Sequence, residues 1–310
     1  MRTTPAPPLP RVDASGRLPA PGERALVLGG GGSTGNAWLI GVVAGLLDGG
    51  VDVTAPDLVV GTSAGATAAA QLAGAPPADL LAAALVPPPP RPAGPPPAGA
   101  RDTSVTDHLA RIDAIIAAAH DPADLRRRLG AAALDLDAAS GGTWSSRWRG
   151  TVAARLPRPD WPDRAVLLTA VDARTGEPVV LDRSSGVDLV DAVAASCASG
   201  AAYAVGDGRY LDGGYRRGEN ADLAAGSARV LVLAPFGGRT RTPLAWGQHL
   251  VAQVGELRAG GSRVVSIAPD AEAEHLFGAH AMDLALRPDA ARAGYRQGRD
   301  GAAGVGALWR

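Results

Sequence analysis

The fold is decided by the stretch RALVLGGGGSTG at residues 24–35, together with DLVVGTSAG at residues 57–65. Each stretch begins with a short apolar run, which is typical of a buried parallel strand, and ends in small residues that permit a tight turn. Between them, residues 36–47 place apolar side chains at helical spacing, and an alanine-rich helix is predicted over residues 66–72. This β-α-β-α order predicts a parallel sheet with right-handed crossovers.

The rest of the chain continues the alternation of strands and helices. Strands are predicted over residues 165–171, 178–181, 229–233 and 263–267, and helices from Ser104, near residues 123–129 and over about 246–257. We therefore expect an α/β fold, in which a mainly parallel central sheet forms the middle of three α/β/α layers.

The segments at both ends and one internal segment differ from this pattern. Residues 1–23 are rich in proline and polar residues, which predicts a flexible N-terminal segment, and residues 289–310 are expected to form a poorly defined tail. The run PPPPRPAGPPP at residues 87–97 cannot sustain a helix, because each proline lacks an amide donor and fixes φ. We expect a surface loop there, either a flap near the site or a tolerated insertion.

Composition and charge exclude several classes of protein. The chain has 310 residues, of which 46% are hydrophobic, so it can bury a sizeable core. With 30 basic and 31 acidic residues, the chain lacks the excess of positive charge that is typical of nucleic-acid-binding proteins. The single cysteine, Cys197, excludes an internal disulfide and a two-cysteine metal motif. Without a long apolar run, we expect a cytoplasmic protein with at most transient contact with a membrane surface.

The motif Gly61-Thr62-Ser63-Ala64-Gly65 lies between a predicted strand and a predicted helix. A nucleophilic serine on such a turn projects its hydroxyl above the sheet, and the small flanking residues let the backbone bend sharply. The helix that begins at Ala64 directs its positive dipole end toward the serine. We interpret Ser63 as a candidate nucleophile.

The glycine run from Gly29 to Gly35 has two interpretations. The spacing of Gly30, Gly32 and Gly35 formally matches a dinucleotide-binding fingerprint. That fingerprint requires an acidic residue after the second strand, where this sequence has Gly61-Thr62-Ser63. Alternatively, the exposed amides of a glycine loop can hold the oxyanion of acyl transfer.

A third motif, Asp212-Gly213-Gly214, comes just after Arg209-Tyr210-Leu211 and is expected on a loop. Asp-Gly is chiefly a turn former, but a carboxylate within hydrogen-bond reach of Ser63 could also accept its proton directly.

In this order, the three motifs resemble the patatin-like phospholipase family over residues 25–233, and the run from Ala194 to Ala198 adds to the match. The resemblance implies a patatin-like acyl hydrolase domain over residues 24–288, acting on a lipid or lysophospholipid ester without cofactor or metal. It also implies a Ser-Asp dyad, with Ser63 as the nucleophile and Asp212 as the general base. The oxyanion hole would be formed by Gly30, Gly31 and Gly32, and the supporting motif residues would be Gly35, Gly61, Gly65, Gly213 and Gly214.

The sequence departs from the family pattern at three places. A proline common after the Ala-Ser-x-Ala run is replaced by the Ser199-Gly200 region. Thr34 stands where many members carry Arg or Lys, so that residue supplies no charge beside the glycine loop. An Asn-Pro often found after the aspartate motif is replaced by Glu219-Asn220-Ala221. These three departures bear on substrate preference.

Two other functions stay open at this stage. One is a non-catalytic α/β domain whose glycine loop holds an anion or a nucleotide. The other is an esterase with a Ser-Asp-His triad, completed by His249 or His275, although both histidines have the sequence context of solvated surface positions. We expect Cys197 to be a small buried residue.

Overall fold

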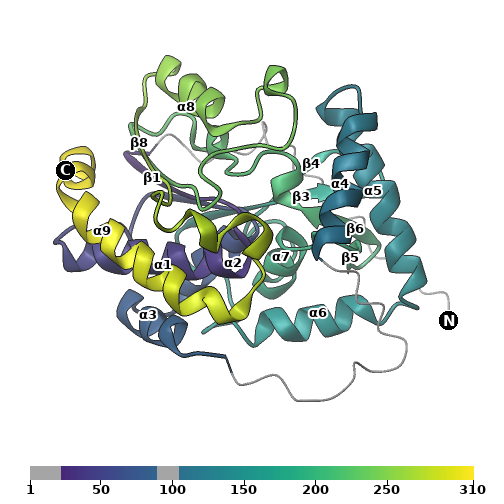
Figure 1. The fold of residues 1–310 in the computed structure, drawn as a ribbon, viewed down its shortest axis with the longest axis horizontal. Helices are drawn as coiled ribbons and strands as arrows, with labels where there is room; N and C mark the ends of the chain where they lie inside the picture. Colours follow the sequence, from purple (N-terminus) through teal and green to yellow (C-terminus); the bar gives the residue numbers. More distant parts are fainter. Residues whose placement is uncertain (1–21, 89–104) are drawn as a thin grey trace.

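The structure is a computed structural model that describes residues 22–88 and 105–310 (Figure 1). Nearly all of the expected N-terminal segment and most of the proline-rich segment 87–97 lie outside the described residues. The strands are β1 (Arg24–Leu28), β2 (Leu58–Gly61), β3 (Ala165–Asp172), β4 (Pro178–Leu181), β5 (Tyr203–Val205), β6 (Gly208–Asp212), β7 (Arg229–Leu233) and β8 (Arg263–Ile267). The helices are α1 (Gly32–Asp48), α2 (Ala64–Gly74), α3 (Pro77–Leu85), α4 (Val105–Ala118), α5 (Pro122–Ala139), α6 (Trp144–Ala153), α7 (Leu189–Ser196), α8 (Leu250–Ala259) and α9 (Arg287–Trp309).

One central sheet contains these strands in the order β5-β6-β3-β2-β1-β7-β8, with β4 paired to β3. The pairs from β3 through β2, β1 and β7 to β8 are parallel, whereas β4, β5 and β6 pair antiparallel at one end. Because β1 and β2 are parallel neighbours, the loops that follow them emerge at the same edge of the sheet. This edge carries the glycine run and Ser63.

Helices cover both faces of the sheet, which confirms the predicted α/β/α layers. Along β1, Leu26 and Leu28 face a core shared with α1 and α2, whereas Ala25 and Val27 face a second core shared with α8. Figure 1 shows α8 on the opposite side of the strands from α1 and α9. The near-continuous apolar sequence of β1 therefore reflects burial on both faces.

The expectation of a poorly defined tail from residue 289 is wrong. Those residues belong to α9, which runs along α1 (Figure 1). A Cβ added at Gly294 would lie 2.2 Å from the carbonyl oxygen of Trp38, and one added at Gly41 would lie 2.2 Å from that of Ala291. The two helices therefore pack through small residues at four-residue spacing, a pattern that a search for bulky apolar residues misses.

Other differences from the sequence prediction concern helices. The short helix expected near 123–129 extends to Ala139 as α5, and α1 begins at Gly32, inside the glycine run. Helices α3, α6 and α7 were not predicted. In α7 nearly every residue is buried, so its sequence lacks the amphipathic period that identifies a surface helix. Within the described ranges, no helix combines the length and apolar character needed to cross a bilayer.

Candidate active site

Ser63 occupies the sharp turn between β2 and α2. Its backbone has φ 53° and ψ −114°, a left-handed region that costs a non-glycine residue about 1–3 kcal/mol. The turn also presses α2 against β1, because a Cβ added at Gly65 would lie 1.9 Å from the carbonyl oxygen of Leu28. At Gly61 a Cβ would meet the Cα of Ala66 at 2.8 Å. The strand-to-helix turn predicted for the GTSAG motif is confirmed.

The end of α7 holds the Ser63 peptide on both sides. The Ser63 amide donates to the Oγ of Ser196 at 2.9 Å, and the thiol of Cys197 donates to the Ser63 carbonyl oxygen at 3.1 Å. Burial, followed by the charge of Asp212, raises the pKa of Cys197 to about 12, so the thiol stays protonated and acts as a donor. Cys197, predicted to be buried, is half-buried in the structure. No role was predicted for Ser196 beyond its place in the family-like run.

Asp212 ends β6 and lies opposite Ala170 of β3. Its side chain is 7% exposed, and one carboxylate oxygen accepts a hydrogen bond from the Gly214 amide at 2.8 Å. Burial raises the pKa of Asp212 to about 6, while hydrogen bonds from the Ser63 side chain and from Gly214 lower it in part. The structure thus brings the carboxyl of Asp212 together with the Ser63 hydroxyl.

A buried amide links the Asp212 turn to the sheet. Nδ2 of Asn220 donates to Oγ1 of Thr62 at 3.0 Å, to Oγ1 of Thr169 at 3.2 Å and to the Gly213 carbonyl oxygen at 3.1 Å. Gly213 itself fits closely, since a Cβ there would lie 2.1 Å from Oγ1 of Thr169. Asn220 was noted in the sequence only as a departure from a family motif, because its contacts depend on the tertiary fold.

The glycine run passes directly beside the serine. A Cβ added at Gly30 would lie 3.7 Å from the Cβ of Ser63. The Gly30 amide, however, donates to the Gly218 carbonyl oxygen at 2.9 Å, so it is already engaged. In the described part of the chain, no group accepts a hydrogen bond from the amides of Gly31 and Gly32. Those two amides, together with the N-terminus of α1, are the donors that remain available.

A second buried carboxyl, that of Glu219, lies behind this loop. Glu219 is 2% exposed, and its Cγ would be 3.1 Å from a Cβ added at Gly29. Nε2 of Gln253 donates to it at 3.3 Å, and no cation among the described residues pairs with it. Burial raises the pKa of Glu219 to about 7. In the sequence, Glu219 stands out only as part of a departure from a family motif, because its burial depends on the contact between the loop and α8.

The histidines considered from the sequence lie elsewhere. His249 immediately precedes α8, and its Nδ1 is buried without a partner among the described residues. His275 is exposed in the short 3-10 helix Glu274–Leu276, and its Nδ1 lies 2.8 Å from the carbonyl oxygen of Glu272. Within the described ranges, neither histidine is hydrogen-bonded to Ser63 or Asp212. The geometry therefore gives no support to a Ser-Asp-His triad.

Comparisons with known proteins agree with the motifs. The sequence model of the family described as patatin-like phospholipase matches residues 26–225. No curated protein matches the chain. Among solved structures, VipD from Legionella pneumophila is 14% identical with a TM-score of 0.43, and the match covers 92% of this chain and 67% of VipD. The type III effector protein ExoU is 15% identical with a TM-score of 0.33, and the match covers 90% of this chain and 54% of ExoU. The chain thus spans about half the length of ExoU.

Proposed function

The chain belongs to the patatin-like phospholipase family and is a lipid ester hydrolase; from that premise we propose that Ser63 is its nucleophile and Asp212 its general base. The observation that carries this proposal is the buried carboxyl of Asp212, whose pKa is lowered in part by the nearby hydroxyl of Ser63, a serine held in a strained turn. We also propose that the hydrolase domain begins at residue 24 and includes α9. A cytoplasmic location stays a prediction.

In the proposed first step, Asp212 accepts the proton of the Ser63 hydroxyl while Oγ bonds to the carbonyl carbon of the ester. The amides of Gly31 and Gly32 donate to the resulting oxyanion. When the tetrahedral intermediate collapses, the bond to the alcohol oxygen breaks, and the proton on Asp212 passes to the departing alcohol. This step leaves an acyl group on Ser63.

In the second step, Asp212 accepts a proton from water as the water oxygen attacks the acyl carbon. Collapse of this intermediate returns the proton to Oγ of Ser63 and releases the fatty acid. The raised pKa of Asp212 supports this role, because a carboxylate with a pKa near 6 is a stronger base than an ordinary aspartate and stays ionised at pH 7.

Mass spectrometry after treatment with a fluorophosphonate tests the assignment of the nucleophile. We expect stoichiometric addition of the phosphonyl group to the peptide that contains Ser63, and none in Ser63→Ala. The absence of labelling together with saturable nucleotide binding would instead favour the non-catalytic anion-binding function.

A further inference from the structure

Two arginines near the elements that carry the candidate site, Arg287 and Arg155, form no ion pair with any described residue. Arg287, at the first position of α9, donates through Nη1 to the carbonyl oxygen of Ser33 at 2.9 Å and to Oδ1 of Asn36 at 3.4 Å. Ser33 directly follows Gly32, so this guanidinium lies at the glycine loop. No described carboxylate pairs with Arg287, and its other two guanidinium nitrogens donate to no described group.

Arg155 lies on the exposed surface just after α6, and its carbonyl oxygen accepts a hydrogen bond from Nε2 of Gln71 in α2. Its guanidinium lies over the ring of Trp148, 5.5 Å from the ring centroid, and forms no ion pair with a described residue. It is close enough to the turn for its charge to lower the pKa of Cys197, whose thiol donates to the Ser63 carbonyl oxygen. Arg287 therefore contacts the glycine loop, and the charge of Arg155 reaches the residue that holds the Ser63 peptide.

A chain of hydrogen bonds joins the two arginines across the start of α2. Nδ2 of Asn36, whose oxygen accepts from Arg287, donates to Oε1 of Gln71 at 2.9 Å, and Nε2 of Gln71 donates to the Arg155 carbonyl oxygen at 3.1 Å. Nδ2 of Asn36 also reaches the carbonyl oxygen of Ala64, the residue after the nucleophile, at 3.5 Å. These contacts tie the guanidinium of Arg287 and the backbone of Arg155 to α1 and α2.

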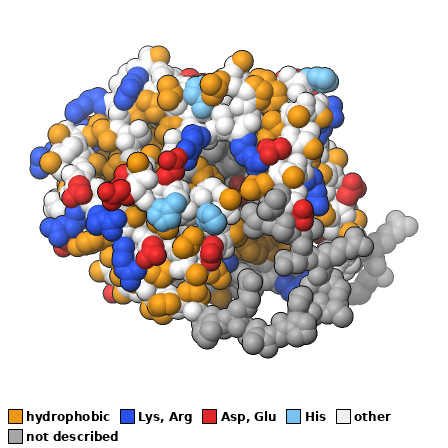
Figure 2. Space-filling view, viewed as in Figure 1, with side chains coloured by type: hydrophobic (Ala, Val, Ile, Leu, Met, Phe, Trp, Pro, Cys, Tyr) orange, Lys and Arg blue, Asp and Glu red, His pale blue; other side chains and the backbone are white. Residues whose placement is uncertain are grey.

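Two like charges held together are unfavourable unless an anion lies between or beside them. Partial burial lowers the pKa of Arg287, and the charge of Arg155 lowers it further. Elsewhere on the face shown in Figure 2, basic and acidic side chains are interspersed. Guanidinium groups suit phosphate oxygens, because they donate several hydrogen bonds in a fixed plane.

We propose that Arg155 and Arg287 form an anion subsite that binds the phosphate of a lipid substrate and selects a headgroup with net negative charge. This inference rests on the proposed function of Ser63 and names the substrate class of the same site. One guanidinium offsets the phosphate charge, and the other disfavours an ammonium group such as that of choline. The subsite thus supplies cations from α9 and the end of α6, whereas Thr34 supplies none.

The test compares three substrates with one short acyl chain: lysophosphatidylglycerol, lysophosphatidylcholine and monoacylglycerol. For the wild-type protein we expect kcat/KM to fall in that order, with at least about a tenfold ratio between the first and the last, in keeping with charge-assisted hydrogen bonds. We expect Arg155→Gln and Arg287→Gln each to remove most of this ratio, and the double variant to bring it near one. Raising the ionic strength should lower the ratio in the wild type, because salt screens the charges.

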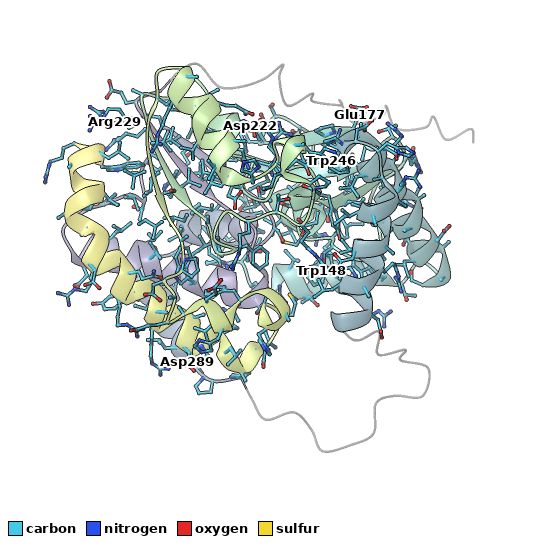
Figure 3. All side chains as sticks on the ribbon, turned by 45° about the horizontal axis from the view of Figure 1, so that its top comes forward. Trp148, Glu177, Asp222, Arg229, Trp246 and Asp289 are labelled. Carbon is cyan, nitrogen blue, oxygen red and sulfur yellow. The ribbon has the colours of Figure 1, made fainter. Side chains whose placement is uncertain are left out.

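Arg292→Gln is the matched control. Arg292 lies on the exposed surface of α9 and pairs with Asp289, which Figure 3 shows at the outer edge of that helix. The Arg292→Gln substitution removes the same charge without changing the subsite, so the ratio of kcat/KM values should stay at its wild-type value. Arg287→Lys keeps the charge and should retain part of the ratio, which a purely structural role for the Ser33 contact does not predict.

The outcomes separate the two proposals. Two results overturn the subsite while Ser63 keeps its role. In the first, the wild type hydrolyses lysophosphatidylglycerol and monoacylglycerol with nearly equal kcat/KM. In the second, the ratio of these two kcat/KM values is the same in the double variant as in the wild type. If inorganic phosphate inhibits hydrolysis and the ratio is near one, the arginines hold free phosphate, which also overturns the headgroup assignment. No hydrolysis of any substrate and no fluorophosphonate labelling overturns the proposed function itself.

Discussion

The backbone amide of Ser63 donates a hydrogen bond to the hydroxyl oxygen of Ser196, at 2.9 Å. Ser63 has a positive φ, and Ser196 is the last residue of the fully packed helix α7. The contact ties a strained turn to a rigid element, so the geometry of the nucleophile depends on a residue far away in sequence.

Removal of this contact should affect both stability and activity. Ser196→Ala leaves the Ser63 amide without its acceptor, which costs about 1–3 kcal/mol for a buried donor. We expect the free energy of unfolding to fall by that amount. We also expect kcat to fall by a larger factor than the factor by which KM changes. Urea unfolding and ester hydrolysis measure the two effects. Ser146→Ala, at an exposed position, should change neither, and a wild-type kcat in Ser196→Ala would contradict the role of this contact.

The activity should depend on pH through Asp212. Burial raises the pKa of Asp212 from 3.8 to about 6, and only the ionised form can accept a proton from Ser63. We expect kcat/KM for an uncharged ester to rise with pH and to level off above about pH 6, with a tenfold fall for each pH unit below it. A rate that stays constant down to pH 4.5 would be incompatible with a buried Asp212 as the base.

The buried Glu219 should lower stability as the pH rises. Its pKa is raised from 4.5 to about 7 in the folded protein, so between these values the folded state binds more protons than the unfolded state. The free energy of unfolding therefore falls through this window, by up to about 3 kcal/mol for this group. Asp212 adds an effect of the same sign between 3.8 and about 6.

Glu219→Gln tests this expectation, because glutamine fills the same space without a charge. We expect the variant to be more stable than the wild type at pH 8 and similar at pH 4, as measured by urea unfolding. Glu274→Gln, at an exposed residue, serves as the control. Equal pH dependence in Glu219→Gln and the wild type would show that Glu219 is not the titrating group.

The packing of α9 on α1 gives a prediction with a control in the same helix. Gly294→Ala places a Cβ 2.2 Å from the Trp38 carbonyl oxygen, so the helices must separate, which we expect to cost about 1–3 kcal/mol. Gly304→Ala has no described atom within 4 Å of the added Cβ and should stabilise the helix by up to about 1 kcal/mol. Thermal unfolding of both variants measures the difference. Equal effects would mean that α9 does not lie against α1 as described.

The sequence predicted those features that depend on residues close together in the chain. Apolar runs located most of the strands, and the GTSAG motif located the turn at Ser63, because both follow from local backbone preferences. Contacts between distant segments could not be predicted in this way. The Gly30 amide is engaged by the carbonyl of Gly218, and α9 is held by glycines that carry no hydrophobic signal. Neither of these two contacts can be inferred from a local sequence pattern.

The central claim, a Ser63–Asp212 dyad that acts without histidine, is tested most directly by acylation rates. Pre-steady-state release of p-nitrophenol from a p-nitrophenyl ester would be measured for Asp212→Asn, His249→Ala and His275→Ala beside the wild type. The account predicts a loss of at least about 100-fold in Asp212→Asn, in line with general-base catalysis, and rates within about twofold of the wild type in both histidine variants. A wild-type rate in folded Asp212→Asn, or a loss of several orders of magnitude in either histidine variant, would contradict it.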